Sequence, residues 1–91
     1  MKSVVIYGSD FENIKQVHEF LAGELDFPDY YGANLDALYD VLTERDQPVS
    51  IEIHMEDIEN PDLLQALEKM TDVIADATAE NEAIELTVVE V

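Results

Sequence analysis

Carboxylates at a regular spacing are the side chains of this sequence with the clearest capacity for chemistry. Asp36, Asp40 and Glu44 recur every four residues, so at about 100° per residue they would form one line along a helix. Like charges at this spacing destabilise a helix by about 0.2–0.5 kcal/mol per pair, and Arg45 is the only cation nearby. Tyr39 would lie at the edge of the same line. The stripe is therefore either an ordinary solvated helix face or a surface that binds cations of another molecule.

Tyrosines beside the stripe favour the second alternative. Pro28 and Gly32 bracket a loop that carries Tyr30 and Tyr31 immediately before the predicted helix. Clustered tyrosines rimmed by charge are typical of the anchors of a protein interface. Tyr31 fits a position in the core equally well.

A pair of carboxylates can also act as a general acid and a general base, as in glycoside hydrolysis. That chemistry needs two carboxyl groups across a cleft, one of them with a pKa raised by an apolar pocket. Asp36 and Asp40 on one exposed helix face are expected to have neither the cleft nor the pocket. We therefore expect no enzyme activity from them.

The remaining candidate groups do not form a recognisable site. His18 falls on an apolar stripe and is expected to be a satisfied histidine at the edge of the core. His54 and Glu56 have no third ligand at metal spacing, and residues 57–62 lack the glycine and the final glutamate of a calcium loop. With no cysteine and only three glycines, thiolate zinc sites and glycine-rich phosphate loops are excluded. No metal and no cofactor are expected.

The charge of the chain is extreme. Twenty-two Asp and Glu residues face four Lys and Arg residues, which gives a formal net charge of −18. Such a field repels nucleic acids and anionic membranes and attracts basic proteins. The same acidity could serve solvation alone, as in halophilic proteins, and composition does not separate the two. No apolar run is long enough for a signal peptide or a membrane span, so a cytoplasmic protein is expected.

The pattern of apolar residues predicts one domain over residues 1–91. Strands are expected at residues 3–7, 49–53 and 84–91, where β-branched residues gather. Helical spacing predicts a first helix capped by Ser9 or Asp10, a second from Asn34 to about Glu44, and a third that starts at Asn60 and Pro61. The order β-α-α-β-α-β predicts an α/β fold, a small three-stranded parallel sheet packed with three to four helices. The order of the strands within the sheet stays open.

Residues 25–44, LDFPDYYGANLDALYDVLTE, resemble the signature segment of the barstar family, intracellular inhibitors of secreted bacterial ribonucleases. The resemblance includes the unusual P-x-Y-Y-G-x-N-L-D-A-L core. It continues more weakly through an initial VVIYG, a helix with His18, a second strand led by Pro48, and a closing T-V-V. It implies a single barstar-like domain that is not an enzyme, and the family's fold agrees with the order of elements above.

The resemblance also implies a partner-binding site, because family members plug the nuclease active site with the aromatic loop and the following helix. Tyr30 would be the loop contact, and Tyr31, Gly32 and Asn34 would shape or line the loop. The helix contacts would be Asp36, Tyr39 and Asp40, of which Asp40 resembles the central anion that takes the place of an RNA phosphate. Two features depart from the family: Tyr39 stands where tryptophan is usual, and the acidic contact of the last helix is either Asp76, which keeps the apolar stripe in phase, or Glu80.

The implied partner is a basic, extracellular-type ribonuclease, bound one to one by a chain that is monomeric when free. Direct contact with nucleic acid or with a membrane is not expected. The alternative is an acidic interaction domain, or nucleic-acid mimic, that binds a different basic protein.

Overall fold

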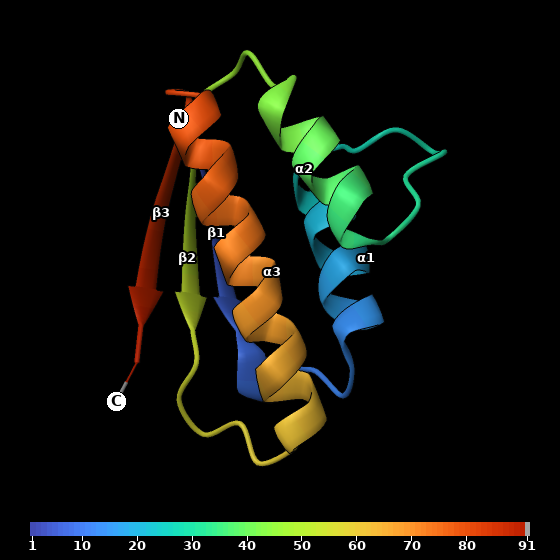
Figure 1. The fold of residues 1–91 in the computed structure, drawn as a ribbon, viewed down its shortest axis with the longest axis vertical. Coiled ribbons are helices and arrows are strands. Elements are labelled where there is room, and N and C mark those ends of the chain that lie inside the picture. Colours follow the sequence, from blue (N-terminus) through green and yellow to red (C-terminus); the bar gives the residue numbers. More distant parts are fainter. Residues whose placement is uncertain (91) are drawn as a thin grey trace.

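The computed structural model describes residues 1–90, and the predicted strand residue Val91 lies outside the described part. The elements follow the predicted order, with one short 3-10 helix, Gly8–Asp10, added after the first strand. They are β1 (Lys2–Tyr7), α1 (Ile14–Glu24), α2 (Leu35–Thr43), β2 (Val49–His54), α3 (Pro61–Glu80) and β3 (Ile84–Val89). Figure 1 shows three strands that run in the same direction beside three helices. The predicted fold class is confirmed.

The sheet has the strand order β1-β2-β3, and both pairs are parallel. Ile6, Ile53 and Val88 are partners across the three strands. Two right-handed crossovers that step in the same direction across a sheet place their helices on the same face. In Figure 1 all three helices accordingly lie together on one side of the sheet. The order that the sequence left open thus decides that one face is covered and the other is not.

The core lies between the covered face and the helices. Alternate residues of β1 and β2 point into it, and the fully buried side chains of α1, α2 and α3 meet them there. On α3 the predicted stripe is buried at all five positions: Leu63, Leu67, Met70, Ile74 and Ala77. Within residues 1–90, no helix combines the length and apolar character needed to cross a membrane.

The predicted helix starts are confirmed at two of three positions. Asn34 caps α2 by accepting a hydrogen bond from the Ala37 amide at 2.8 Å, and Asn60 caps α3 ahead of a proline. The prediction for α1 was wrong, because Ser9 and Asp10 belong to the 3-10 helix. Asn13 caps α1 instead, accepting from the Gln16 amide at 3.0 Å. The third strand ends at Val89, so Glu90, which was predicted as part of it, lies outside the strand.

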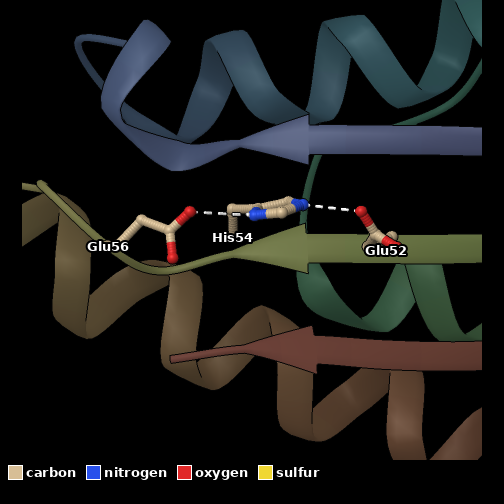
Figure 2. Close-up of polar contacts among 3 residues, drawn as sticks. All are labelled: Glu52, His54 and Glu56. Carbon is tan, nitrogen blue, oxygen red and sulfur yellow. Dashed lines mark hydrogen bonds and ion pairs between the residues drawn. The ribbon is translucent and has the colours of Figure 1, made fainter. Parts of the chain in front are cut away.

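The open face of the sheet carries a histidine held between two carboxylates (Figure 2). His54 Nε2 lies 2.6 Å from Glu52 Oε2, and Nδ1 lies 3.0 Å from Glu56 Oε1. The ring stacks on Tyr7 of β1, with ring centroids 4.5 Å apart. The neighbour from β3 is Val89, so no charged group of that strand is paired directly with His54. These contacts join the end of β2 to the connection that follows it.

Two carboxylate partners require both ring nitrogens of His54 to donate. A neutral imidazole has only one N–H, so this geometry belongs to the imidazolium. The hydrogen bond with Glu52, followed by that with Glu56, accordingly raises the pKa of His54 above its ordinary value of 6.5. The side chain is also placed to interact favourably, as a cation, with the face of the Tyr7 ring.

This arrangement predicts how stability depends on pH. The folded-state pKa of His54 is raised, so its contribution is fully present below pH 6.5 and is lost as the pH rises through the folded-state value. We expect the free energy of unfolding, measured with urea, to fall for the wild type as the pH rises above 6.5. His54→Gln should flatten this decline, and Glu56→Gln should reduce it. An equal decline in the wild type and in His54→Gln would contradict the assignment.

Candidate functional site

A cleft of about 480 Å³ separates the exposed side of α2 from the loop that precedes this helix. We call residues 26–33 the aromatic loop, because it contributes Phe27, Tyr30 and Tyr31 to the cleft. The facing wall is formed by the side of α2 that carries Asp40. The structure thus brings four of the predicted site residues to one cleft: Tyr30, Tyr31, Gly32 and Asp40.

The aromatic loop begins and ends with a residue in the left-handed region. The φ angle is 54° at Asp26 and 50° at Ala33, and neither residue is glycine. This conformation costs about 1–2 kcal/mol for a residue such as Ala33, whereas aspartate adopts it more readily. Strain of this kind persists only where the surrounding contacts hold it, and it is concentrated at functional sites. The shape of the aromatic loop is therefore imposed by its surroundings.

The middle of the loop is anchored by Tyr31. Its hydroxyl oxygen lies 2.6 Å from Nδ1 of His18, a residue that is only 3% exposed, and its ring packs edge-to-face on Phe27. Burial lowers the pKa of His18 and raises the pKa of Tyr31 to about 12, so both side chains are neutral at physiological pH. The expectation of a satisfied core histidine is confirmed. Tyr30, the preceding residue in the chain, is 87% exposed.

The end of the loop is closed by Asn34 and Gly32. The Asn34 side chain caps α2 with its oxygen, and its Nδ2 donates to the Gly32 carbonyl at 3.3 Å. A Cβ atom placed on Gly32 would lie 2.9 Å from that nitrogen, so a larger residue would disturb the cap. Both residues therefore determine how the loop enters the helix.

The acidic stripe of α2 is exposed at all three positions, Asp36, Asp40 and Glu44. The first turn of a helix favours Asp36, but nothing in the helix itself favours the other two carboxylates. Within residues 1–90 the ion pairs are the two that His54 makes, so none reaches this stripe. Tyr39 is half-buried and packs against the core. At about 100° per residue it lies on the opposite flank of the stripe from the cleft.

The other predicted acidic contacts lie outside the cleft. Two acidic residues that belong neither to the stripe of α2 nor to the predicted contacts line it instead. Asp36 on α2 and Asp76 and Glu80 on α3 are all exposed, and none of them lines the cleft. Asp26 and Asp46 line it, one from each end of the segment that contains the loop and α2. The signal that could have found them is their position, directly flanking the aromatic loop and the helix end.

The cleft suits a cationic side chain of another molecule better than a reaction. Asp26, Asp40, Glu44 and Asp46 surround it, and aromatic rings form one wall. Within the described part of the chain, no group of three His, Asp or Glu residues has the arrangement of a metal site. His54, which was not expected to bind a metal, lies on the open face of the sheet and is held by Glu52 and Glu56.

Tyr31 has a buried hydrogen-bond partner and Tyr30 is exposed, so the same substitution at the two positions makes a matched pair. Tyr31→Phe removes the partner of a buried ring nitrogen, so we expect it to lower the free energy of unfolding by about 1–3 kcal/mol. Tyr30→Phe removes the same atom from an exposed side chain and should change the free energy by less than about 0.5 kcal/mol. Urea unfolding at neutral pH measures both. Equal effects of the two substitutions would show that the Tyr31 hydroxyl anchors nothing.

Comparison with known proteins identifies a family for this chain. The family model described as "Barstar (barnase inhibitor)" matches residues 1–90. A protein of Bacillus subtilis (strain 168) that bears the name "Putative ribonuclease inhibitor YrdF" is 42% identical over 81 residues, which cover 88% of this chain and 89% of the relative. Both matches extend far beyond residues 25–44 that first suggested the resemblance. On this evidence the chain belongs to the barstar family.

Proposed function

We propose that this chain inhibits a secreted, barnase-type ribonuclease by inserting the acidic side of α2 and the aromatic loop into the active site of the nuclease. Membership of the barstar family and the name of the relative from Bacillus subtilis support ribonuclease inhibition in general, and an inhibitor rather than an enzyme. The type of nuclease and the manner of blocking are our inference.

One observation carries the proposal. Asp40 shares the cleft with Tyr30, which is 87% exposed. Asp36 is exposed on the same stripe of α2, and no ion pair within residues 1–90 neutralises either carboxylate. The cleft of a ribonuclease binds a polyanion and must therefore be lined with cationic groups. A surface that presents carboxylates at fixed positions on a helix is complementary to such a cleft. The charges missing from this face would then be supplied by the nuclease.

The proposed inhibition has two physical parts. Asp36 and Asp40 take the places of RNA phosphates, Asp40 as the central anion, while Tyr30 and Tyr39 supply aromatic contact that excludes water. Asp76 on α3 would add a carboxylate at the margin. The field of the net charge of −18 acts over a longer distance and accelerates encounter with a basic protein. A loop and helix that are already ordered lose little conformational entropy on binding.

The experiment is a titration of the chain against a panel of barnase-type ribonucleases. We expect RNA cleavage to stop at one equivalent of the chain for at least one nuclease, with calorimetry giving the same stoichiometry. Low salt favours detection, because association of this kind is accelerated by charge. Absence of binding to every nuclease at low salt would contradict the proposal and favour a different basic protein as the partner.

Two substitutions that each remove one negative charge separate contact from steering. Asp40→Asn should accelerate dissociation by at least about 30-fold. This factor corresponds to a loss of about 2 kcal/mol, the threshold that defines an interface hot spot. Known hot spots include residues of a barstar-family complex. Glu85→Gln lies on the open face of the sheet and should change only association, by less than about twofold at low salt. Stopped-flow or surface-based kinetics measure both constants.

Small and equal effects of the two substitutions on both rate constants would contradict the proposed site. Such a result would mean that only the net charge of the chain matters for binding. Circular dichroism of both variants provides the control, because neither residue contributes to the core.

A further inference from the structure

Arg45 is the one Lys or Arg residue that lines the cleft within the described part of the chain. Four carboxylates share this cleft, yet Arg45 forms no ion pair with any of them. Its guanidinium donates instead to two backbone carbonyls. Nη1 donates to the Leu25 oxygen at 3.2 Å, and Nε donates to the Gln47 oxygen at 3.1 Å. The guanidinium therefore binds backbone carbonyls and does not neutralise the carboxylates of the stripe on α2.

The Leu25 carbonyl is a hydrogen-bond acceptor at the end of a helix, where no helical N–H is available to it. Leu25 is the C-terminal cap of α1, where carbonyl groups lack helical partners and carry the negative end of the helix dipole. The last turn of α1 contains no basic residue of its own. Arg45 supplies that cation from a position 20 residues later in the chain. The next residue is Asp26, the first residue of the aromatic loop, whose backbone is left-handed, so the contact holds the base of the loop.

Arg45 is itself held in place by Asn81, at the end of α3. The Asn81 Nδ2 donates to the Arg45 carbonyl at 2.6 Å and to the Leu42 carbonyl at 2.8 Å. The Asn81 Oδ1 accepts from the Ala83 amide at 3.0 Å. This half-buried amide therefore connects the start of β3 to the end of α2. From there Arg45 continues the connection to the end of α1.

From these contacts we infer that Arg45, seated by Asn81, is a positioning residue that locks the base of the aromatic loop to the end of α2 and so fixes Tyr30 relative to Asp40. The two contact residues belong to separate segments that meet at the cleft. Asn34 secures the loop where it enters α2, and Arg45 secures it where it leaves α1. The consequence for binding rests on the proposed function, whereas the locking of the loop does not.

The competing explanation is that Arg45 only moderates repulsion among the carboxylates of the cleft. Arg45→Lys separates the two, because lysine keeps the charge but lacks the planar arrangement of nitrogens that reaches two carbonyls at once. Arg45→Gln removes the charge as well. Lys69→Gln, at an exposed position on α3, is the matched control for the loss of one positive charge.

The first measurement uses the free chain and needs no partner. Amide hydrogen exchange follows Phe27 and Tyr31, whose N–H groups donate to the Ala22 and Pro28 carbonyls. Arg45→Lys and Arg45→Gln should each accelerate this exchange by about tenfold, the usual result of losing one hydrogen bond to a charged group. Exchange at Ile51 and Ile53 in the core should stay unchanged, and Lys69→Gln should match the wild type. Wild-type exchange in Arg45→Lys would overturn the inference.

The second measurement is binding to the inhibited nuclease. Arg45→Lys should weaken binding by about tenfold, and the loss should shrink when Tyr30→Ala is already present, because the two residues act through the same contact. Fully additive losses would overturn the positioning of Tyr30. If the wild type binds no nuclease while Arg45→Lys still loosens the loop, the proposed function fails and the locking role stands.

Discussion

The carboxylates of the stripe on α2 have no cationic partner within residues 1–90, and the rest of the structure has to offset their mutual repulsion. Four Lys and Arg residues accompany 22 Asp and Glu residues, and the one that reaches the cleft, Arg45, is committed to backbone carbonyls. Repulsion along the stripe of α2 must therefore be offset by the other side of the helix. Leu38 and Leu42 are fully buried there, and burial of such a side chain contributes about 1.5–3 kcal/mol against a few tenths for each repulsive pair.

Glu52 and Glu56 at the open face of the sheet and Asp36 and Asp40 on α2 differ in their charged neighbours. On the open face of the sheet, Glu52 and Glu56 share the cation of His54, and Tyr7 stacks on its ring. On the opposite side, Asp36 and Asp40 receive no cation from the described chain. Glu85 on the same open face has no such pairing within residues 1–90, so the pairing belongs to the His54 cluster and not to the whole face.

The two adjacent tyrosines of the aromatic loop have different roles, because one is anchored in the protein and the other is exposed. Tyr31 turns inward to His18 and Phe27, and Tyr30 is thereby held outward in a loop with a left-handed residue at each end. Contacts to the loop from α1, from α2 and, through Arg45, from the end of α3 over-determine its conformation. Such order in the free chain reduces the entropy lost on binding, which is how a small surface can bind firmly.

Much of this could be predicted from the sequence, since spacing and capping act locally. The order β-α-α-β-α-β, the caps Asn34 and Asn60, the buried stripe of α3 and the acidic stripe of α2 all depend on residues within a few positions of one another. The open face of the sheet, the inward turn of Tyr31 rather than Tyr30, and the contact of Arg45 with Leu25 required the tertiary structure. Each arises where segments far apart in the chain meet, and the spacing of residues along one segment carries no information about its neighbour.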